Sequence, residues 1–125
     1  MSNTVTDGVR IRVVPQFHPE RSSLDRFFFS YTVEICNEGD SAVQLVARHW
    51  IITDANGQVD HVKGPGVVGE TPRLGHMQYF RYTSFCPLPT SLGAMQGSFQ
   101  MVREDGTTFD AQIEAFVLAD PDQMN

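Results

Sequence analysis

Hydrophobic and polar residues alternate along most of this chain. The alternation is strictest between Tyr31 and Ile35, where Thr32 and Glu34 separate the apolar side chains. Successive side chains of a β-strand point to opposite faces, so this period predicts a strand over residues 27–37 with one buried face. Similar patterns predict six further strands, at residues 9–13, 43–53, 58–63, 77–84, 93–104 and 107–118.

The strand pattern determines the expected fold class. No stretch holds an apolar i, i+3, i+4, i+7 stripe without an interrupting Gly or Pro, so no helix of ordinary length is predicted. Seven strands in a chain of 125 residues, with turn signals between them, predict an all-β fold, a seven-stranded fibronectin type III/immunoglobulin-like β-sandwich. We expect residues 1–125 to form a single domain in which residues 1–8, small and polar, are flexible.

The register of the last predicted hairpin depends on the length of its loop. A two-residue loop, Asp105-Gly106, would mix core-facing and solvent-facing side chains across the two strands. A three-residue loop at 104–106 sets Met101 opposite Phe109 and keeps the apolar faces together. We therefore predict the three-residue loop, with Gly106 in the left-handed conformation that completes a G1 bulge.

Charge and hydropathy exclude several classes of function. The formal net charge is −6, which argues against nonspecific binding to nucleic acid or to an anionic membrane, since both require a positive field. No apolar run is long enough for a membrane span, and the N-terminus lacks the basic and apolar regions of a signal peptide. We expect a cytoplasmic protein that binds neither nucleic acid nor membrane.

The two cysteines imitate a disulfide framework. Cys36, Trp50 and Cys86 follow the order of the disulfide and core tryptophan of an immunoglobulin domain. Cys36, however, shares its strand face with Thr32 and Glu34, so it points away from the core. We therefore expect two free thiols.

A glycine-rich segment, Gly64–Gly69, spells the GxGxxG pattern of nucleotide-binding folds. In those folds the pattern opens a helix, whose N-terminal N–H groups bind the pyrophosphate. Here no helical pattern follows, so a Rossmann site is excluded. Two interpretations stay open: a tight loop whose glycines permit positive φ, or a backbone nest that holds a phosphate beside Lys63 or Arg73.

The histidines and carboxylates do not form a recognisable reactive site. An even-numbered loop at Asn56-Gly57, of two or four residues, would place His49 and His61 on opposite faces, so they are not expected to face one another as metal ligands. Asp110 and Glu114 share a face but lie ~13 Å apart along a strand. We predict no catalytic residues, no metal site and no cofactor, and hence no enzyme.

The chain resembles the ApaG family over nearly its whole length. Two blocks carry most of the match, Arg48–Gly57 and Gly64–Glu70, and Tyr82–Ser84 continues it. Three positions depart from the family pattern: His76-Met77-Gln78 replaces a Pro-Gly-Glu turn, Glu114 a proline, and Phe99 a tyrosine. The resemblance implies a fibronectin type III-like β-sandwich.

The resemblance also implies a kind of function. Bacterial ApaG proteins are associated with cobalt and magnesium tolerance without an established enzymatic activity, and related domains in eukaryotic F-box and polymerase-interacting proteins look like protein-binding modules. Our hypothesis is a binding module that acts through protein partners, linked only indirectly to cation tolerance, with a homodimer left open. The alternative is a protein that binds a nucleotide or another phosphate-bearing ligand at residues 64–69. The residues expected to bind a ligand or partner are Lys63, Gly64, Gly66, Gly69, Glu70 and Arg73.

Overall fold

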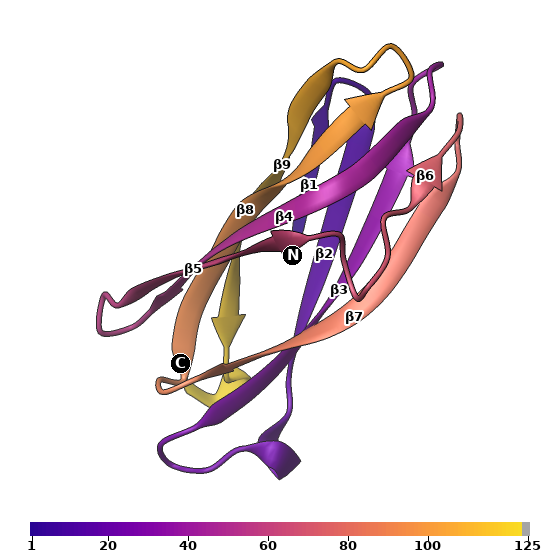
Figure 1. Cartoon of the computed structure of the whole chain (residues 1–125). Coiled ribbons are helices and arrows are strands. Elements are labelled where there is room, and N and C mark those ends of the chain that lie inside the picture. Colours follow the sequence, from indigo (N-terminus) through magenta and orange to yellow (C-terminus); the bar gives the residue numbers. More distant parts are fainter. Residues whose placement is uncertain (124–125) are drawn as a thin grey trace.

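The structure, a computed structural model, describes residues 1–123 and consists almost entirely of β-strands (Figure 1). Nine strands follow one another in these residues: β1 Ser2–Thr6, β2 Val9–Phe17, β3 Phe27–Asn37, β4 Val43–Asp54, β5 Val59–Pro65, β6 Arg73–Leu74, β7 Tyr79–Leu88, β8 Leu92–Arg103 and β9 Thr108–Ala119. Two 3-10 turns, η1 Pro19–Arg21 and η2 Pro121–Gln123, are the helical elements of this part of the chain. The all-β prediction is confirmed.

The strands form two antiparallel sheets that pack face to face as a sandwich. One sheet has the order β1-β2-β3-β7, and the other has the order β5-β4-β8-β9, with the short β6 paired to the start of β4. The seven predicted strands are all present, and β1 and β6 are additional. Figure 1 shows the layers diverging on the side where β5 and β7 lie.

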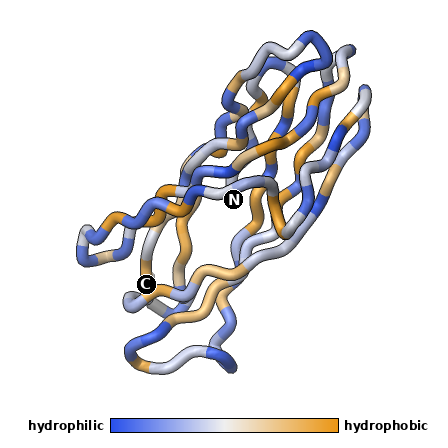
Figure 2. Tube along the Cα trace, viewed as in Figure 1, coloured by the Kyte–Doolittle hydropathy of each residue, from blue (hydrophilic) through white to orange (hydrophobic). Residues whose placement is uncertain are grey.

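The core lies between the inner faces of the two sheets and is built from alternate positions of the strands. Figure 2 shows hydrophobic (orange) and hydrophilic (blue) positions following one another along the strands. At its centre the indole of Trp50 makes edge-on contacts with Tyr31, Phe99 and Phe116, with ring centroids 5.1, 6.0 and 6.1 Å away. Such edge-to-face pairs are favourable arrangements of aromatic rings. The alternation seen in the sequence thus corresponds to the buried face.

The expected flexibility of residues 1–8 is wrong, because this segment forms a strand. β1 pairs with β2 from Ser2 opposite Val13 to Thr6 opposite Val9. Asp7 and Gly8, with φ of 47° and 86°, form the tight turn between them, as type I′ hairpins require. Hydrogen bonds to the neighbouring strand hold this polar segment in place. The sequence does not predict this pairing, because the segment lacks a hydrophobic alternation.

β1 also lies beside β9 and so covers one edge of the second sheet. The hydroxyl of Thr4 donates to the carboxylate of Glu114 over 3.1 Å, and the hydroxyl of Thr6 accepts a hydrogen bond from the backbone N–H of Gln112 over 3.1 Å. The sandwich is therefore closed on the β1–β9 side, and the opposite edges, β5 and β7, are left open.

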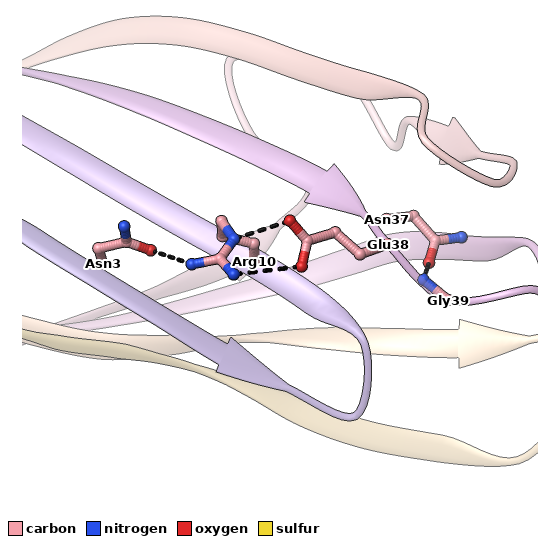
Figure 3. Close-up of polar contacts among 5 residues, drawn as sticks. All are labelled: Asn3, Arg10, Asn37, Glu38 and Gly39. Atoms are coloured by element: carbon pink, nitrogen blue, oxygen red, sulfur yellow. Dashed lines mark hydrogen bonds and ion pairs between the residues drawn. The ribbon is translucent and has the colours of Figure 1, made fainter.

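A polar cluster ties the first hairpin to the β3–β4 connection (Figure 3). The guanidinium of Arg10 contacts the Glu38 carboxylate through two nitrogens, at 2.8 and 3.3 Å, and donates to Asn3 over 2.8 Å. The hydrogen bond from Arg10 lowers the pKa of Glu38, and the same contact raises the pKa of Arg10. Nearby, the Oδ1 of Asn37 accepts from the Gly39 N–H over 3.0 Å.

The last hairpin has the predicted register. Met101 lies opposite Phe109, and Gly106 closes the loop at a φ of 84°, as a G1 bulge requires. A second bulge, between Met95 and Gly97, was not predicted. It inserts an extra residue in β9 and lets both ends of that strand point apolar side chains inward.

Both cysteines are free, as predicted. Cys36 faces outward from β3, whereas the buried Cys86 faces the core from β7, so the two thiols lie on opposite sides of one sheet. Burial raises the pKa of the Cys86 thiol to about 11, which keeps it protonated at neutral pH. Pro87 is tolerated in β7 because this strand is at an edge of its sheet.

Candidate binding surface on the β4–β5 hairpin

A β-bulge in β4 decides which side chains of this strand face the core. Leu45 pairs with Met101 and Ala47 with Gln100, so Val46 is an extra residue. A one-residue insertion moves every following side chain to the other face. As a result Trp50 is buried, and His49 faces outward together with Ala47 and Ile51.

The loop that joins β4 to β5 is longer than predicted, and its length is odd. Thr53 lies opposite Val59, which leaves five residues, 54–58, between the paired positions. The Asp54 carboxylate stabilises this loop by accepting hydrogen bonds from the N–H groups of Asn56 and Gln58, at 2.9 and 3.0 Å. The prediction that His49 and His61 lie on opposite faces is therefore wrong.

The two histidines lie on the same outer face and touch. The Nε2 of His49 is 2.9 Å from the Nδ1 of His61, with ring centroids 5.1 Å apart. His49 is half-buried and His61 is exposed. Beside them, a shallow hollow of about 590 Å³ is bordered by residues of β4, β5, β8 and β9: Val46, Ala47, Arg48, His49, Lys63, Gly64, Pro65, Ser98, Gln100 and Asp110.

The glycine-rich segment is a small hairpin of its own, after the end of β5. The N–H of Val67 donates to the carbonyl of Glu70 over 2.8 Å, and the N–H of Glu70 donates back over 2.9 Å. The two residues at its tip, Val68 and Gly69, have φ of 44° and 79°, the conformation of a type I′ turn. Gly66, at φ 58°, lies so close to the Glu70 carbonyl that a side chain there would collide with it.

This geometry favours one of the two interpretations of the GxGxxG pattern, a tight loop, over a phosphate-binding nest. The N–H groups of Gly66, Val67 and Glu70 all donate to backbone carbonyls, including that of Val46. Within residues 1–123, the N–H groups at the tip of this small hairpin are left without a protein partner. The glycines therefore serve the turn and the close approach, and only two amides are free to meet an anion.

An arginine that sequence reasoning did not include holds the start of this segment. The guanidinium of Arg48 donates to the carbonyls of Pro65 and Gly66, at 2.8 and 3.1 Å. It also covers Gly64, where a β-carbon would lie 3.0 Å from the guanidinium. The available signal was that Arg48 opens the block Arg48–Gly57, one of the two that carry most of the family resemblance.

The expected site residues are only partly brought together. Lys63 lies directly opposite His49 on the outer face, and Gly64 follows it beside Arg48. Gly66, Gly69 and Glu70 belong to the small hairpin described above. Arg73 instead forms an ion pair with Glu104 over 2.6 Å, so its charge is directed at the β8–β9 turn.

The backbone of β5 offers an open sheet edge. The Gly66 N–H donates to the Val46 carbonyl, and the Asp54 N–H donates to the Gln58 carbonyl. The even-numbered residues of β5 are therefore the ones whose backbone groups bond to β4. Residues 59, 61 and 63 consequently point their N–H and C=O groups away from β4. No strand pairs with that edge in residues 1–123.

One buried polar group lies inside the same open side of the sandwich. The hydroxyl of Tyr82 is buried and forms no hydrogen bond of good geometry with the described residues, although the Trp50 indole lies near enough to oppose the rise of its pKa. Burial raises the pKa of this phenol, and the neighbouring Tyr31 adds to the effect. The phenol therefore stays neutral.

Two features are absent from the described part of the chain. No group of three or more His, Cys, Asp or Glu side chains in residues 1–123 is placed to hold a metal ion. No helix in the same range is long and apolar enough to cross a membrane.

Comparison with known proteins identifies the family. The model of the ApaG domain matches residues 18–103. The chain is 50% identical over its full length to all of Protein ApaG from Anaeromyxobacter dehalogenans strain 2CP-C, and 52% identical over 97% of its length to Protein ApaG from Beijerinckia indica, covering 95% of that protein. A crystal structure of a Bordetella pertussis protein described as ApaA superposes with a TM-score of 0.88 at 43% identity, over 90% of this chain and 94% of that one. The chain therefore belongs to the ApaG family.

Proposed function

We propose that this protein is a binding module that acts through a protein partner, and that the partner contacts the β5 edge and the hairpin at residues 66–70. The observation that carries the proposal is the open edge of β5. An exposed row of backbone donors and acceptors is a template for an added strand, a recurring mode of peptide recognition. The other edge of this sheet, β9, is covered by β1 through the Thr4 and Thr6 contacts.

The side chains along this edge favour an apolar contact with a polar border. Val59 on the outer face of β5, Val62 on its inner face and Val68 beyond its end are exposed to 48%, 40% and 55%, although valine is a residue that proteins usually bury. Asp60 and Lys63 flank them with opposite charges. Pro65 ends the row of donors, so the edge suits a short partner strand along residues 59–63.

Val68 adds a second feature of a contact surface. A β-branched residue at positive φ is a genuine outlier, with a cost of about 1–3 kcal/mol that the rest of the fold must offset. This valine has φ 44° and is half-exposed at the tip of the hairpin. The hairpin thus holds an apolar side chain in an exposed position, where a partner would contact it. We propose that the family's association with cobalt and magnesium tolerance is indirect and arises through that partner.

The test is a capture experiment with matched variants. Val59→Ser and Val117→Ser remove the same side chain at positions exposed to 48% and 50%, but only Val59 lies on the β5 edge. Lys63→Pro removes an outward N–H without breaking the ladder with β4. We expect the Val59 and Lys63 variants to lose a partner that wild type and Val117→Ser retain. Hydrogen exchange of the complex should protect the amides of residues 59, 61 and 63.

The outcome that would contradict the proposal is equally definite. If folded Val59→Ser and Lys63→Pro proteins keep every partner at wild-type levels, the β5 edge is not the contact surface. Unchanged exchange at residues 59, 61 and 63 in a captured complex leads to the same conclusion.

A second candidate function is binding of a phosphate-bearing ligand at the glycine-rich segment. It is favoured by His49 and Lys63, which border one hollow on the outer face, and by the Arg48 guanidinium, which contacts the carbonyls of Pro65 and Gly66 from the other face of β4. Pyrophosphate or a nucleotide should then shift the amide signals of Val68 and Gly69, and Lys63→Gln should weaken the effect. Absence of any shift at millimolar ligand removes this candidate.

A further inference from the structure

The outer face of the β4–β5 hairpin holds two imidazoles in a fixed relation. His49 lies in the middle of β4, paired with Lys63 on one side and with Ser98 on the other. His61 lies opposite Ile51, two residues along the same face. Diagonal neighbours of this kind are within reach of one another for long side chains. Ladders on both sides of β4 thus hold the backbone of His49, and the ladder between β4 and β5 holds that of His61.

The separation of the two nitrogens is informative about metal geometry. Imidazole nitrogen binds a divalent transition metal at about 2.0–2.1 Å. Two such ligands at right angles around one ion are then ~2.9 Å apart, and at a tetrahedral angle they are ~3.4 Å apart. The Nε2 of His49 and the Nδ1 of His61 are 2.9 Å apart. This is the length of an ordinary hydrogen bond, and it also equals the separation of neighbouring ligands of a square-planar or octahedral ion.

We propose that His49 and His61 form a two-imidazole chelating site for a divalent transition metal ion of the Cu²⁺ or Ni²⁺ type. Those ions favour tetragonal or square-planar coordination by nitrogen ligands. Without metal, one N–H···N hydrogen bond joins the rings. With metal, the proton of the hydrogen-bonding ring moves to its far nitrogen, so that each ring is protonated on its far nitrogen. The rings turn until the lone pairs of both near nitrogens converge on an ion that lies to one side of the line joining them.

The surroundings make this an open site. The described residues supply no third His, Cys, Asp or Glu ligand, so water or an exogenous ligand completes the coordination. Lys63 is the cation on the same face, and Asp110 is the carboxylate that borders the adjoining hollow. Mg²⁺ is a hard ion that requires oxygen ligands, so the imidazole pair discriminates against it.

The experiment is calorimetric titration of untagged protein with Ni²⁺, Cu²⁺, Zn²⁺ and Mg²⁺ near pH 7.5, with NMR to locate the broadening caused by Ni²⁺ or Cu²⁺. The test variants are His49→Gln and His61→Gln, and the matched control is His76→Gln, an exposed histidine bonded to the Gly39 carbonyl. Thermal unfolding of the metal-free variants confirms that they are folded.

We expect one Ni²⁺ or Cu²⁺ per chain, broadening centred on residues 49–51 and 61–63, and no heat from Mg²⁺. Each test variant should bind at least tenfold more weakly, about 1.4 kcal/mol, whereas His76→Gln should bind like wild type. Equal affinity of wild type and His61→Gln overturns the proposal, and so does an absence of Ni²⁺ and Cu²⁺ binding. The titration needs no partner, so its failure leaves the proposed partner surface unaffected.

Discussion

Gly66 and Gly69 allow two costs of a side chain in the glycine-rich hairpin to be measured separately: the cost of a positive φ and the cost of a collision with the main chain. Gly66 and Gly69 both have positive φ, at 58° and 79°. A β-carbon at Gly66 would collide with the carbonyl oxygen of Glu70, whereas one at Gly69 would meet nothing within 4 Å. Substitution of each glycine by alanine therefore imposes the same kind of backbone cost, and only Gly66→Ala adds a collision with the main chain.

The magnitudes differ enough to measure. Alanine in the left-handed region costs roughly 1–2 kcal/mol, partly offset by about 0.4–1 kcal/mol because the unfolded chain is less flexible, so Gly69→Ala should lose about 1 kcal/mol. The collision adds about 1–3 kcal/mol, as overpacking does in cores, so Gly66→Ala should lose about 2–4 kcal/mol. At about 2.1 cal/mol/K per residue of unfolding entropy, the melting temperatures should fall by ~4 °C and ~8–15 °C.

The assay is reversible unfolding in urea and by heat, followed by circular dichroism and tryptophan fluorescence. The urea slope m should be unchanged in both variants, since neither changes the surface exposed on unfolding. Equal losses of stability in Gly66→Ala and Gly69→Ala would refute the reasoning, because the main-chain contact would then contribute nothing. Greater loss in Gly69→Ala would refute it more strongly.

Three further predictions concern other parts of the fold. Met77→Gly should raise the free energy of unfolding by about 1 kcal/mol, since Met77 is exposed at φ 60° and glycine removes that strain; urea unfolding measures this. Tyr82→Phe should leave stability unchanged or raise it by up to about 1 kcal/mol, because its buried hydroxyl forms no hydrogen bond of good geometry in the described chain; a loss above 1 kcal/mol would contradict this. Glu38→Gln should flatten the acid limb of the stability profile. Arg10 lowers the pKa of Glu38 in the folded state, so the contribution of the pair is present above the unfolded-state pKa and is lost as pH falls through the lower folded-state pKa. Urea midpoints between pH 6 and pH 2 test this, and parallel profiles for wild type and variant would exclude it.

The sequence by itself determined the fold class. Alternation between Tyr31 and Ile35 predicts a strand with one buried face, and the inner face of β3 is buried as expected. The three-residue loop before Gly106 could also be predicted, because the apolar residues on both strands agree with only one register. These are local properties. The two-residue period of strand side chains and the positive φ of Gly106 are each determined within a short stretch of chain.

The tertiary structure decided the candidate site. The Val46 bulge sets the faces of β4, and it depends on pairing with β8 and on the Gly66 N–H, both distant in sequence. The five-residue loop at 54–58 then brings His49 and His61 to one face, where an even loop would have separated them. A change of a single residue in register moves a side chain from one face of a sheet to the other, and hydrogen bonds between strands fix that register. The alternation along β4 could therefore predict a strand, but its neighbours in the sheet determined which side chains meet.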